Sequence, residues 1–320
     1  MIGSRRLVDP QLLPLLDLIP PPNLTHETLP ALRARPVMFQ VNPRDVERTD
    51  LTVMNIPGPA GAPQVEVLFY RPRGLTGPAP CILHIHGGGY VTGSAQSMEP
   101  AHRRLAADLS CCIASVNYRL APETTFPGPV EDCYAALAWL FASAETLKID
   151  PARIGVMGES AGGGLAAALA LLARDRGEYR LAFQHLIYPM IDDRTCAPAE
   201  PNPYAGEFIW PPASNHFGWT ALLGHPPGGE DVSPYAAAAR AEDLSGLPPT
   251  FLATGALDLF LEENLEYARR LIRAGVSTEL HVYPGAFHAF QWAVEADVSR
   301  TAARDSQAAL AKTLGAPAPT

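Results

Sequence analysis

The sequence contains no long apolar stretch. No run of about 18 apolar residues, the usual minimum for a transmembrane helix, occurs anywhere in the 320 residues. The N-terminal region also lacks the apolar core of a signal peptide, because Pro10, Pro14 and Asp17 interrupt it. We therefore predict no membrane-spanning helix and expect a cytoplasmic protein.

Positive charge is also scarce. The 24 Lys and Arg residues face 33 Asp and Glu residues, which leaves a net charge of −9. A surface that binds nucleic acid needs the opposite sign, so nucleic acid is excluded as an expected partner. Because hydrophobic residues make up 47% of the chain and charged residues only 18%, an intrinsically disordered protein is excluded as well.

Cysteine is rare, and its spacing fits neither a disulfide framework nor a metal site. The chain has five cysteines, an odd number. Cys111 and Cys112 are adjacent, so a strand would point them to opposite faces and keep them from sharing one metal or one ordinary disulfide. We interpret all five as reduced and mostly buried: Cys81, Cys111, Cys112, Cys133 and Cys196. No metal and no cofactor are expected.

Apolar segments separated by Pro and Gly define the fold class. The alternation at residues 51–53 and 65–69 predicts an antiparallel hairpin. Six short apolar runs then alternate with stretches of helical periodicity, which predicts an α/β protein with a mostly parallel central sheet flanked by helices. The predicted strands of that sheet are Cys81–Ile85, Cys112–Val116, Arg153–Met157, Phe183–Tyr188, Phe251–Thr254 and Glu279–Tyr283.

Two stretches fall outside this rhythm. Residues 11–40 carry leucines on either side of a Pro-rich break and predict two short amphipathic helices. Residues 190–235 are rich in Pro, Gly and aromatic side chains and contain no clean strand. An excursion this long is typical of a functional insertion or lid.

The segment Gly158-Glu159-Ser160-Ala161-Gly162 fits the pattern G-x-S-x-G. A predicted strand runs into it and a predicted helix runs out of it. Small residues on both sides allow a sharp turn that lifts the Ser160 hydroxyl above the sheet edge, where it can act as a nucleophile. The alternative is a serine that only caps the N-terminus of an ordinary helix.

A second glycine-rich segment, His86-Gly-Gly-Gly-Tyr90, follows the strand at 81–85. Its consecutive glycines leave backbone N–H groups uncovered, which suits an oxyanion hole formed by Gly88, Gly89 and the N–H of Ala161. We expect His86 and Gly87 to support this loop. One alternative is a phosphate-binding loop, but that would need Lys-Ser/Thr after the glycines. Another is a metal site formed by His84 and His86, but the sequence offers no third ligand nearby.

A serine nucleophile needs a base and an acid that orients the base. In this topology the acid and then the histidine should follow the serine, each just after a strand. Asp258 and His288 hold those positions. Glu262 and Glu263 are rival acids, but they fall about one turn into the following helix. The remaining histidines after Ser160 lie within predicted strands or in the insertion: His185, His216, His225 and His281.

The motifs together resemble the hormone-sensitive-lipase family of bacterial carboxylesterases, within the α/β-hydrolase superfamily. The similar segments are His86-Gly-Gly-Gly-Tyr90, Val116-Asn-Tyr-Arg-Leu-Ala-Pro-Glu123, Gly158-Glu-Ser-Ala-Gly-Gly163 and Gly285-Ala-Phe-His288. The resemblance implies an α/β-hydrolase core at residues 46–189 and 236–320. It also implies a helical cap, formed by residues 1–45 and the insertion at residues 190–235.

The resemblance implies a serine carboxylesterase that uses Ser160, His288 and Asp258 on small, short-chain acyl esters. It also allows a homodimer through the edge strand at Glu279–Tyr283. The chain departs from the family at Glu159, where Asp is usual, and at Asp258-Leu-Phe-Leu-Glu262, where Asp-Pro-Leu-x-Asp is usual. Candidate residues for the substrate pocket are Tyr90, Glu159, Phe208, Trp210, Phe217 and Trp219. The four aromatic residues of the insertion could instead form the core of the cap itself: Phe208, Trp210, Phe217 and Trp219.

Two alternatives remain open from the sequence. A protein on this scaffold could bind a small molecule without catalysis, although relatives of that kind lack a member of the triad. An amidase or a thioesterase would use the same three residues, so the sequence does not separate these activities from ester hydrolysis.

Overall fold

The computed structural model describes residues 3–35, 39–196 and 200–316. Its centre is one eight-stranded sheet in the order β1-β2-β4-β3-β5-β6-β7-β8. Strand β2 pairs antiparallel with β1 and β4, and every later neighbour pairs in parallel. The strands are β1 (Thr49–Ile56), β2 (Val65–Pro72), β3 (Ala79–Ile85), β4 (Cys112–Asn117), β5 (Ile149–Glu159), β6 (Gln184–Ile187), β7 (Thr250–Gly255) and β8 (Thr278–Tyr283).

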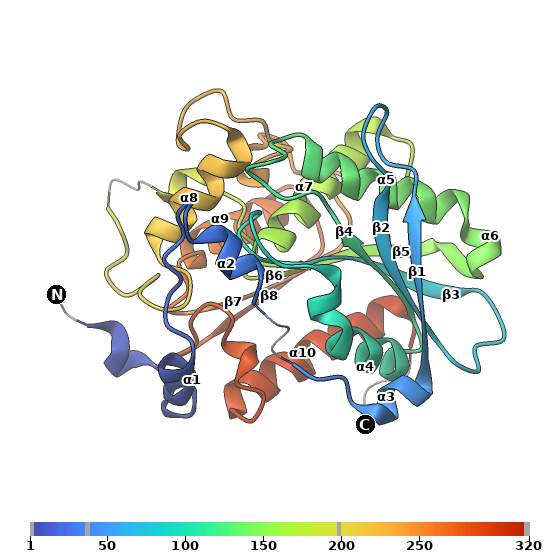
Figure 1. Cartoon of the computed structure of the whole chain (residues 1–320), viewed down its shortest axis with the longest axis horizontal. Helices are drawn as coiled ribbons and strands as arrows, with labels where there is room; N and C mark the ends of the chain where they lie inside the picture. The colour runs from blue at the N-terminus through green and yellow to red at the C-terminus, as the bar shows by residue number, and fades with distance from the viewer. Residues whose placement is uncertain (1–2, 36–38, 197–199, 317–320) are drawn as a thin grey trace.

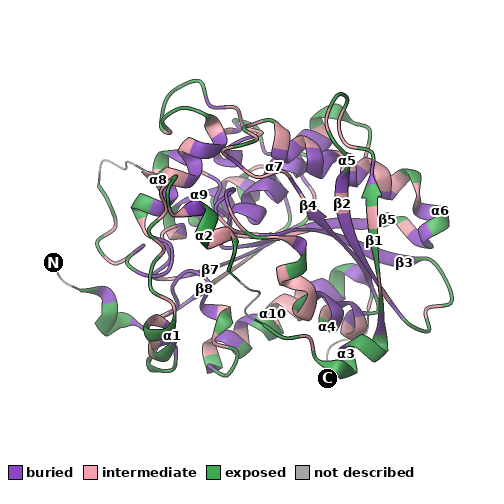
Figure 2. Cartoon of the chain, in the orientation of Figure 1, coloured by how far each residue is buried: buried purple, intermediate pink, exposed green. Residues whose placement is uncertain are grey.

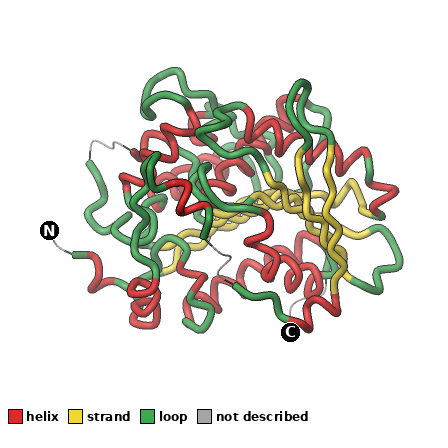
Figure 3. Tube along the Cα trace, viewed as in Figure 1, coloured by secondary structure: helices red, strands yellow, loops and turns green. Residues whose placement is uncertain are grey.

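Helices cover both faces of this sheet, which runs through the middle of the molecule in Figure 3. Helices α5 (Gly128–Ala142), α7 (Ala161–Arg176) and α9 (Leu261–Arg273) lie on one face, and α4 (Glu99–Leu109) and α10 (Asp297–Leu314) lie on the other (Figure 1). The remaining helices are α1 (Leu13–Leu18), α2 (Leu29–Arg33), α3 (Pro43–Arg48), α6 (Ala144–Leu147) and α8 (Pro212–Leu223).

Burial on both faces explains the composition of the central strands. All seven residues of β3 are buried, which is why this strand reads as a continuous apolar run instead of an alternation. The edge strand β1 carries exposed and half-buried residues between its buried ends, and the contrast is visible in Figure 2. Cys111 and Cys112 face different core clusters on opposite sides of the sheet, as their adjacency predicts. All five cysteines are free thiols.

The N-terminal segment and the insertion touch each other across the carboxyl end of the sheet. Ser214 Oγ, on α8, donates to the carbonyl of Pro22 at 3.0 Å. The ring of Phe217, also on α8, packs edge-on against His26 with the centroids 5.2 Å apart. Figure 1 shows α2 and α8 next to each other on this side of the molecule. These contacts bring together two segments that are nearly two hundred residues apart in the chain.

The predicted hairpin and all six predicted strands are present, with small differences at their ends. Strand β6 stops at Ile187, one residue earlier than expected, because Tyr188 has a φ of 33° and leaves the extended conformation. Within residues 3–35, 39–196 and 200–316, no helix has the length and apolar character needed to cross a bilayer.

Candidate active site

Ser160 lies at the sharp turn between β5 and α7. Its backbone has a φ of 55° and a ψ of −124°, a strained conformation for a residue other than glycine. Gly162, two residues after Ser160, is required by close packing, because a Cβ at this position would lie 2.0 Å from the carbonyl oxygen of Ile85. The sharp turn therefore depends on the second glycine of the G-x-S-x-G pattern.

Ser160, His288 and Asp258 form one continuous hydrogen-bonded chain. Ser160 Oγ donates to His288 Nε2 at 2.9 Å, and His288 Nδ1 donates to Asp258 Oδ2 at 2.9 Å. The second carboxylate oxygen of Asp258 accepts the backbone N–H of Phe260 at 2.9 Å. All three side chains are buried, so the hydrogen bonds lie in a medium of low dielectric. This arrangement can transfer the serine proton to the imidazole while the carboxylate fixes the imidazole tautomer.

The rival acids lie elsewhere. Glu262 is exposed and accepts a hydrogen bond from Asn202 Nδ2 at 3.0 Å. Glu263 is buried, accepts the backbone N–H of Ile191 at 2.7 Å, and also accepts the hydroxyl of Thr195. Burial raises the pKa of Glu263 well above its ordinary value. Among the described residues, the only carboxylate hydrogen-bonded to His288 is that of Asp258.

The glycine-rich loop after β3 presents free backbone donors. In the part of the chain that the structure describes, the N–H groups of Gly88, Gly89 and Ala161 have no protein acceptor. The carbonyl of Gly88, by contrast, accepts the N–H of Thr92 at 2.9 Å. Free backbone N–H groups of this kind are the donors that an oxyanion requires.

His86 contacts this glycine-rich loop and a neighbouring aromatic ring. Its Nδ1 donates to the carbonyl of Gly87 at 2.8 Å, and its ring stacks on Tyr118 with the centroids 4.3 Å apart. The hydroxyl of Tyr118 in turn donates to the carbonyl of His86 at 2.9 Å. Burial lowers the pKa of His86 to about 4, so its ring is neutral in the folded protein at neutral pH.

Glu159 and His84 join the ends of β5 and β3. Glu159 Oε2 and His84 Nε2 lie 2.8 Å apart, and His84 Nδ1 lies 3.2 Å from Ser115 Oγ. Both ring nitrogens of His84 therefore have protein partners and none is left for a metal. Within the described ranges, no three His, Cys, Asp or Glu side chains come together as a metal site.

Aromatic rings surround His288, and only that of Trp210 belongs to a residue predicted for the pocket. Tyr188 packs against His288 with centroids 4.6 Å apart, and Phe260 meets it edge-on at 5.2 Å. The ring of Trp210 lies 6.4 Å away. Burial and the nearby carboxylates of Glu159 and Asp258 raise the pKa of Tyr188 well above its ordinary value. Only the position of Tyr188 at the carboxyl end of a predicted strand could have indicated its place at the site.

Three of the remaining pocket candidates are buried, whereas Phe217 is half-buried against His26. Tyr90 and Trp219 have no exposed surface and lie against each other at 5.2 Å, and the hydroxyl of Tyr90 donates to the carbonyl of Met190. This corrects the expectation that Tyr90 and Trp219 line a substrate pocket, because a fully covered side chain cannot touch a ligand. Phe208 packs against Phe287 at 5.7 Å.

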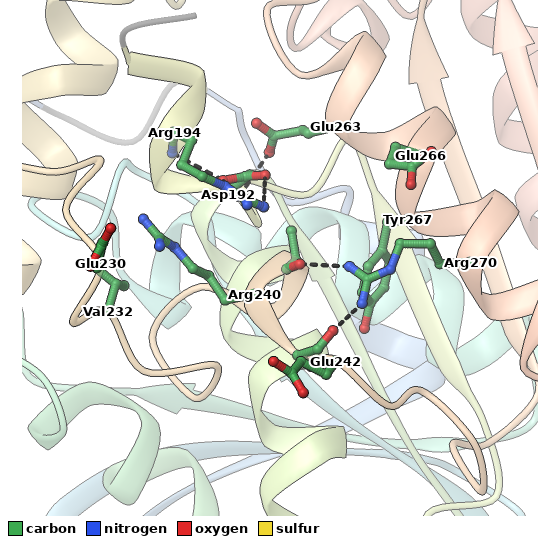
Figure 4. A pocket seen from close by; sticks show the side chains of 12 residues that line it. Asp192, Arg194, Glu230, Val232, Arg240, Glu242, Glu263, Glu266, Tyr267 and Arg270 are labelled. Carbon is green, nitrogen blue, oxygen red and sulfur yellow. Dashed lines mark hydrogen bonds and ion pairs between the residues drawn. The ribbon is translucent and has the colours of Figure 1, made fainter.

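A polar cavity of about 600 Å³ lies beside α9, and none of the three hydrogen-bonded residues above lines it (Figure 4). Its arginines are already paired. Arg194 binds Asp192, Arg240 binds the buried Asp193, and Arg270 donates to two backbone carbonyls. Because its guanidinium groups have partners, we assign no substrate to this cavity.

Comparison with known proteins gives one consistent picture. The family described as the alpha/beta hydrolase fold matches residues 82–292. The chain is 33% identical to the carboxylesterase NlhH of Mycobacterium tuberculosis over 292 residues, 90% of each chain. It is 33% identical to an ethyl acetate hydrolase of Pseudomonas putida over 229 residues, 70% of each chain. Among solved structures, a bacterial heroin esterase shares 41% identity with a TM-score of 0.89, over 98% of this chain and 99% of that chain.

Proposed function

This chain belongs to the hormone-sensitive-lipase family of carboxylesterases, within the α/β-hydrolase superfamily, and is a serine carboxylesterase. We propose that it hydrolyses short-chain acyl esters and that Ser160, His288 and Asp258 are its catalytic triad. The observation that carries the proposal is the chain of two 2.9 Å hydrogen bonds from serine to imidazole to carboxylate. Each of the three side chains is hydrogen-bonded to the partner that its proposed role requires.

In the proposed mechanism, Ser160 Oγ attacks the ester carbonyl carbon while His288 Nε2 takes the serine proton. The carboxylate of Asp258 stabilises the imidazolium that forms, through the Nδ1–H hydrogen bond. The carbonyl oxygen becomes an oxyanion, which the free N–H groups of Gly88, Gly89 and Ala161 stabilise. His288 then protonates the leaving alcohol, and an acyl-serine remains.

Water completes the proposed reaction. His288 Nε2 accepts a proton from the water molecule, whose oxygen attacks the acyl carbon. Collapse of the second oxyanion releases the carboxylic acid and returns the proton to Ser160 Oγ. One ester and one water give one acid and one alcohol, and no cofactor takes part.

We further propose that residues 1–45 and 190–235 act as a cap that limits the length of the acyl chain. The contacts of Ser214 with Pro22 and of Phe217 with His26 support a single unit built from both segments. The backbone N–H of Asp9 also donates to the carbonyl of Gly285 at 3.1 Å, only three residues before His288. A roof attached this close to the base restricts the space above Ser160.

A matched set of substrates tests the reaction class. We expect p-nitrophenyl acetate and butyrate to be hydrolysed with kcat/KM values well above those of the corresponding anilide and thioester. A higher value for the anilide would indicate an amidase, and a higher value for the thioester would indicate a thioesterase. Binding of all three without turnover would indicate a non-catalytic binding protein.

A further inference from the structure

Ile209, in the insertion, occupies a strained backbone conformation. Its φ is 59°, which is unfavourable for a β-branched side chain, and Ile209 is nevertheless buried. The backbone N–H of Trp210 donates to the carbonyl of Phe208 at 2.6 Å, so these three residues form a γ-turn of the rare positive-φ type. Strain of this kind persists only where the surroundings impose it, and it gathers at functional sites.

The turn places the indole of Trp210 against the glycine-rich loop. A Cβ on Gly89 would lie 2.1 Å from Cη2 of Trp210, so the tip of the indole fills the space where a side chain at position 89 would stand. A second contact holds the same indole from its other end, because Trp210 Nε1 donates to Oδ1 of the fully buried Asn215 at 3.3 Å. Trp210 is therefore fixed at both ends.

Helix α8 contacts Gly89 from a second direction. A Cβ on Gly218 would lie 2.7 Å from the carbonyl oxygen of Gly89, closer than real Cβ atoms approach a backbone oxygen. Gly89 itself has a φ of 60° and no side chain, so nothing of its own restricts its backbone. Contacts from Trp210 and Gly218 supply that restriction.

We propose that Trp210 and Gly218 are positioning residues that act through Gly89 and hold its N–H in the orientation an oxyanion requires. The inference rests on the proposed function, in which the N–H of Gly89 is one of three donors. It assigns the insertion a part in transition-state stabilisation in addition to roofing the substrate. Preorganised donors are effective because they need no reorganisation as the charge develops.

Two substitutions test the proposal from the two directions. Trp210→Phe keeps an aromatic ring and removes the indole tip that touches Gly89. Gly218→Ala adds a methyl group that must displace the carbonyl of Gly89, although alanine is a better helix former than glycine. Trp139→Phe is the matched control, because Trp139 lies on α5 and packs edge-on against Phe69.

The measurements are kcat and KM for p-nitrophenyl butyrate and the inhibition constant of a short-chain trifluoromethyl ketone, which forms an oxyanion on the catalytic serine. For both variants we expect kcat to fall about tenfold or more, KM to stay within about twofold, and the inhibitor to weaken by the same factor as kcat. Trp139→Phe should keep all three values.

Unchanged kcat and inhibitor affinity in both variants would overturn the inference. A change confined to KM and to acyl-chain preference would also overturn it and would make Trp210 a pocket wall. If Trp210→Phe fails to fold, as judged by circular dichroism, Gly218→Ala decides. Failure of the proposed function is distinguishable, because the unaltered protein would then neither hydrolyse the ester nor bind the ketone.

Discussion

Arg33 donates two parallel hydrogen bonds to the carboxylate of Glu123, at 2.7 Å and 2.8 Å. The same guanidinium group donates to the carbonyl oxygens of Val91 and Ala121, each at 2.7 Å. Arg33 ends α2, in the N-terminal segment, while Val91 directly follows the glycine-rich loop. One side chain therefore ties the proposed cap to the core next to the site.

Replacement of Glu123 by Gln should destabilise the protein slightly and in a pH-dependent way. Arg33 lowers the pKa of Glu123 to about 2 from its ordinary 4.5, so the ion pair stabilises the folded state fully above pH 4.5. That contribution is lost as the pH falls towards 2. Because the side chain of Glu123 is 64% exposed, we expect a loss of less than about 1 kcal/mol at pH 7.

Urea unfolding at pH 7, 5 and 3.5 measures this difference. Glu145→Gln is the control, since Glu145 is exposed and forms no ion pair among the described residues. A difference between the unaltered protein and Glu123→Gln that is as large at pH 3.5 as at pH 7 would contradict the account.

His185 should make the folded state sensitive to acid. It stacks on Phe251 with centroids 4.2 Å apart, and its Nε2 lies 2.8 Å from Ser306 Oγ. Burial lowers the pKa of His185 to about 3. The imidazole of His185 binds a proton near pH 6.5 in the unfolded chain but stays neutral in the folded chain. The free energy of unfolding is therefore unaffected by this group above pH 6.5 and falls as the pH is lowered from 6.5 to 3. Each such proton costs about 1.4 kcal/mol per pH unit.

The variant His185→Gln should reduce this slope, because glutamine can still bond Ser306 but cannot take up a proton. The free energy of unfolding at pH 7, 6 and 5 provides the slope. His86, whose pKa is about 4, should retain its own share in the variant. An unaltered slope in His185→Gln would show that this histidine is not neutral and buried as described.

Asp258→Asn should keep the fold and lower kcat by about 10⁴-fold, because the amide favours the wrong imidazole tautomer. Glu262→Gln should have little effect, since Glu262 is exposed and bonds Asn202. Steady-state kinetics on a short p-nitrophenyl ester compare the two. Severe loss in Glu262→Gln with mild loss in Asp258→Asn would move the acid to Glu262.

Acyl-chain length should show an optimum between about two and six carbons. Each acyl CH₂ that the pocket buries contributes about 0.8 kcal/mol, until a full pocket turns the gain into a cost of about 1–3 kcal/mol. Values of kcat/KM for p-nitrophenyl esters of two to about sixteen carbons give the profile. A profile still rising at twelve carbons, with a jump above the solubility limit of the substrate, would indicate a true lipase.

The sheet and the positions of Ser160, Asp258 and His288 could be predicted from the sequence. Both depend on short apolar segments and on the order of these segments along the chain. The apolar runs of β3 to β8 fix the parallel strands, and the carboxyl ends of parallel strands lie at one edge. Ser160, Asp258 and His288 each follow such a strand, so the sequence was sufficient to expect them close together.

The surroundings of the site could not be predicted in the same way. The contact between Tyr188 and His288 depends on the backbone conformation of Tyr188, whose φ of 33° cannot be predicted from a sequence pattern. The sequence predicted Tyr90 and Trp219 at the pocket, but an aromatic residue can line a pocket or fill a core, and the sequence alone does not distinguish the two. Only packing distinguishes these roles, and it buries both side chains completely.

Reaction of the protein with a fluorophosphonate, followed by mass spectrometry and ester assays on the same samples, tests the catalytic triad most directly. We expect one phosphonate per chain on the peptide that contains Ser160, with activity lost in proportion to labelling. The Ser160→Ala variant should take up no label, and its kcat should fall on the order of 10⁶-fold. Labelling of another residue, or near-normal turnover by Ser160→Ala, would show that Ser160 is not the nucleophile.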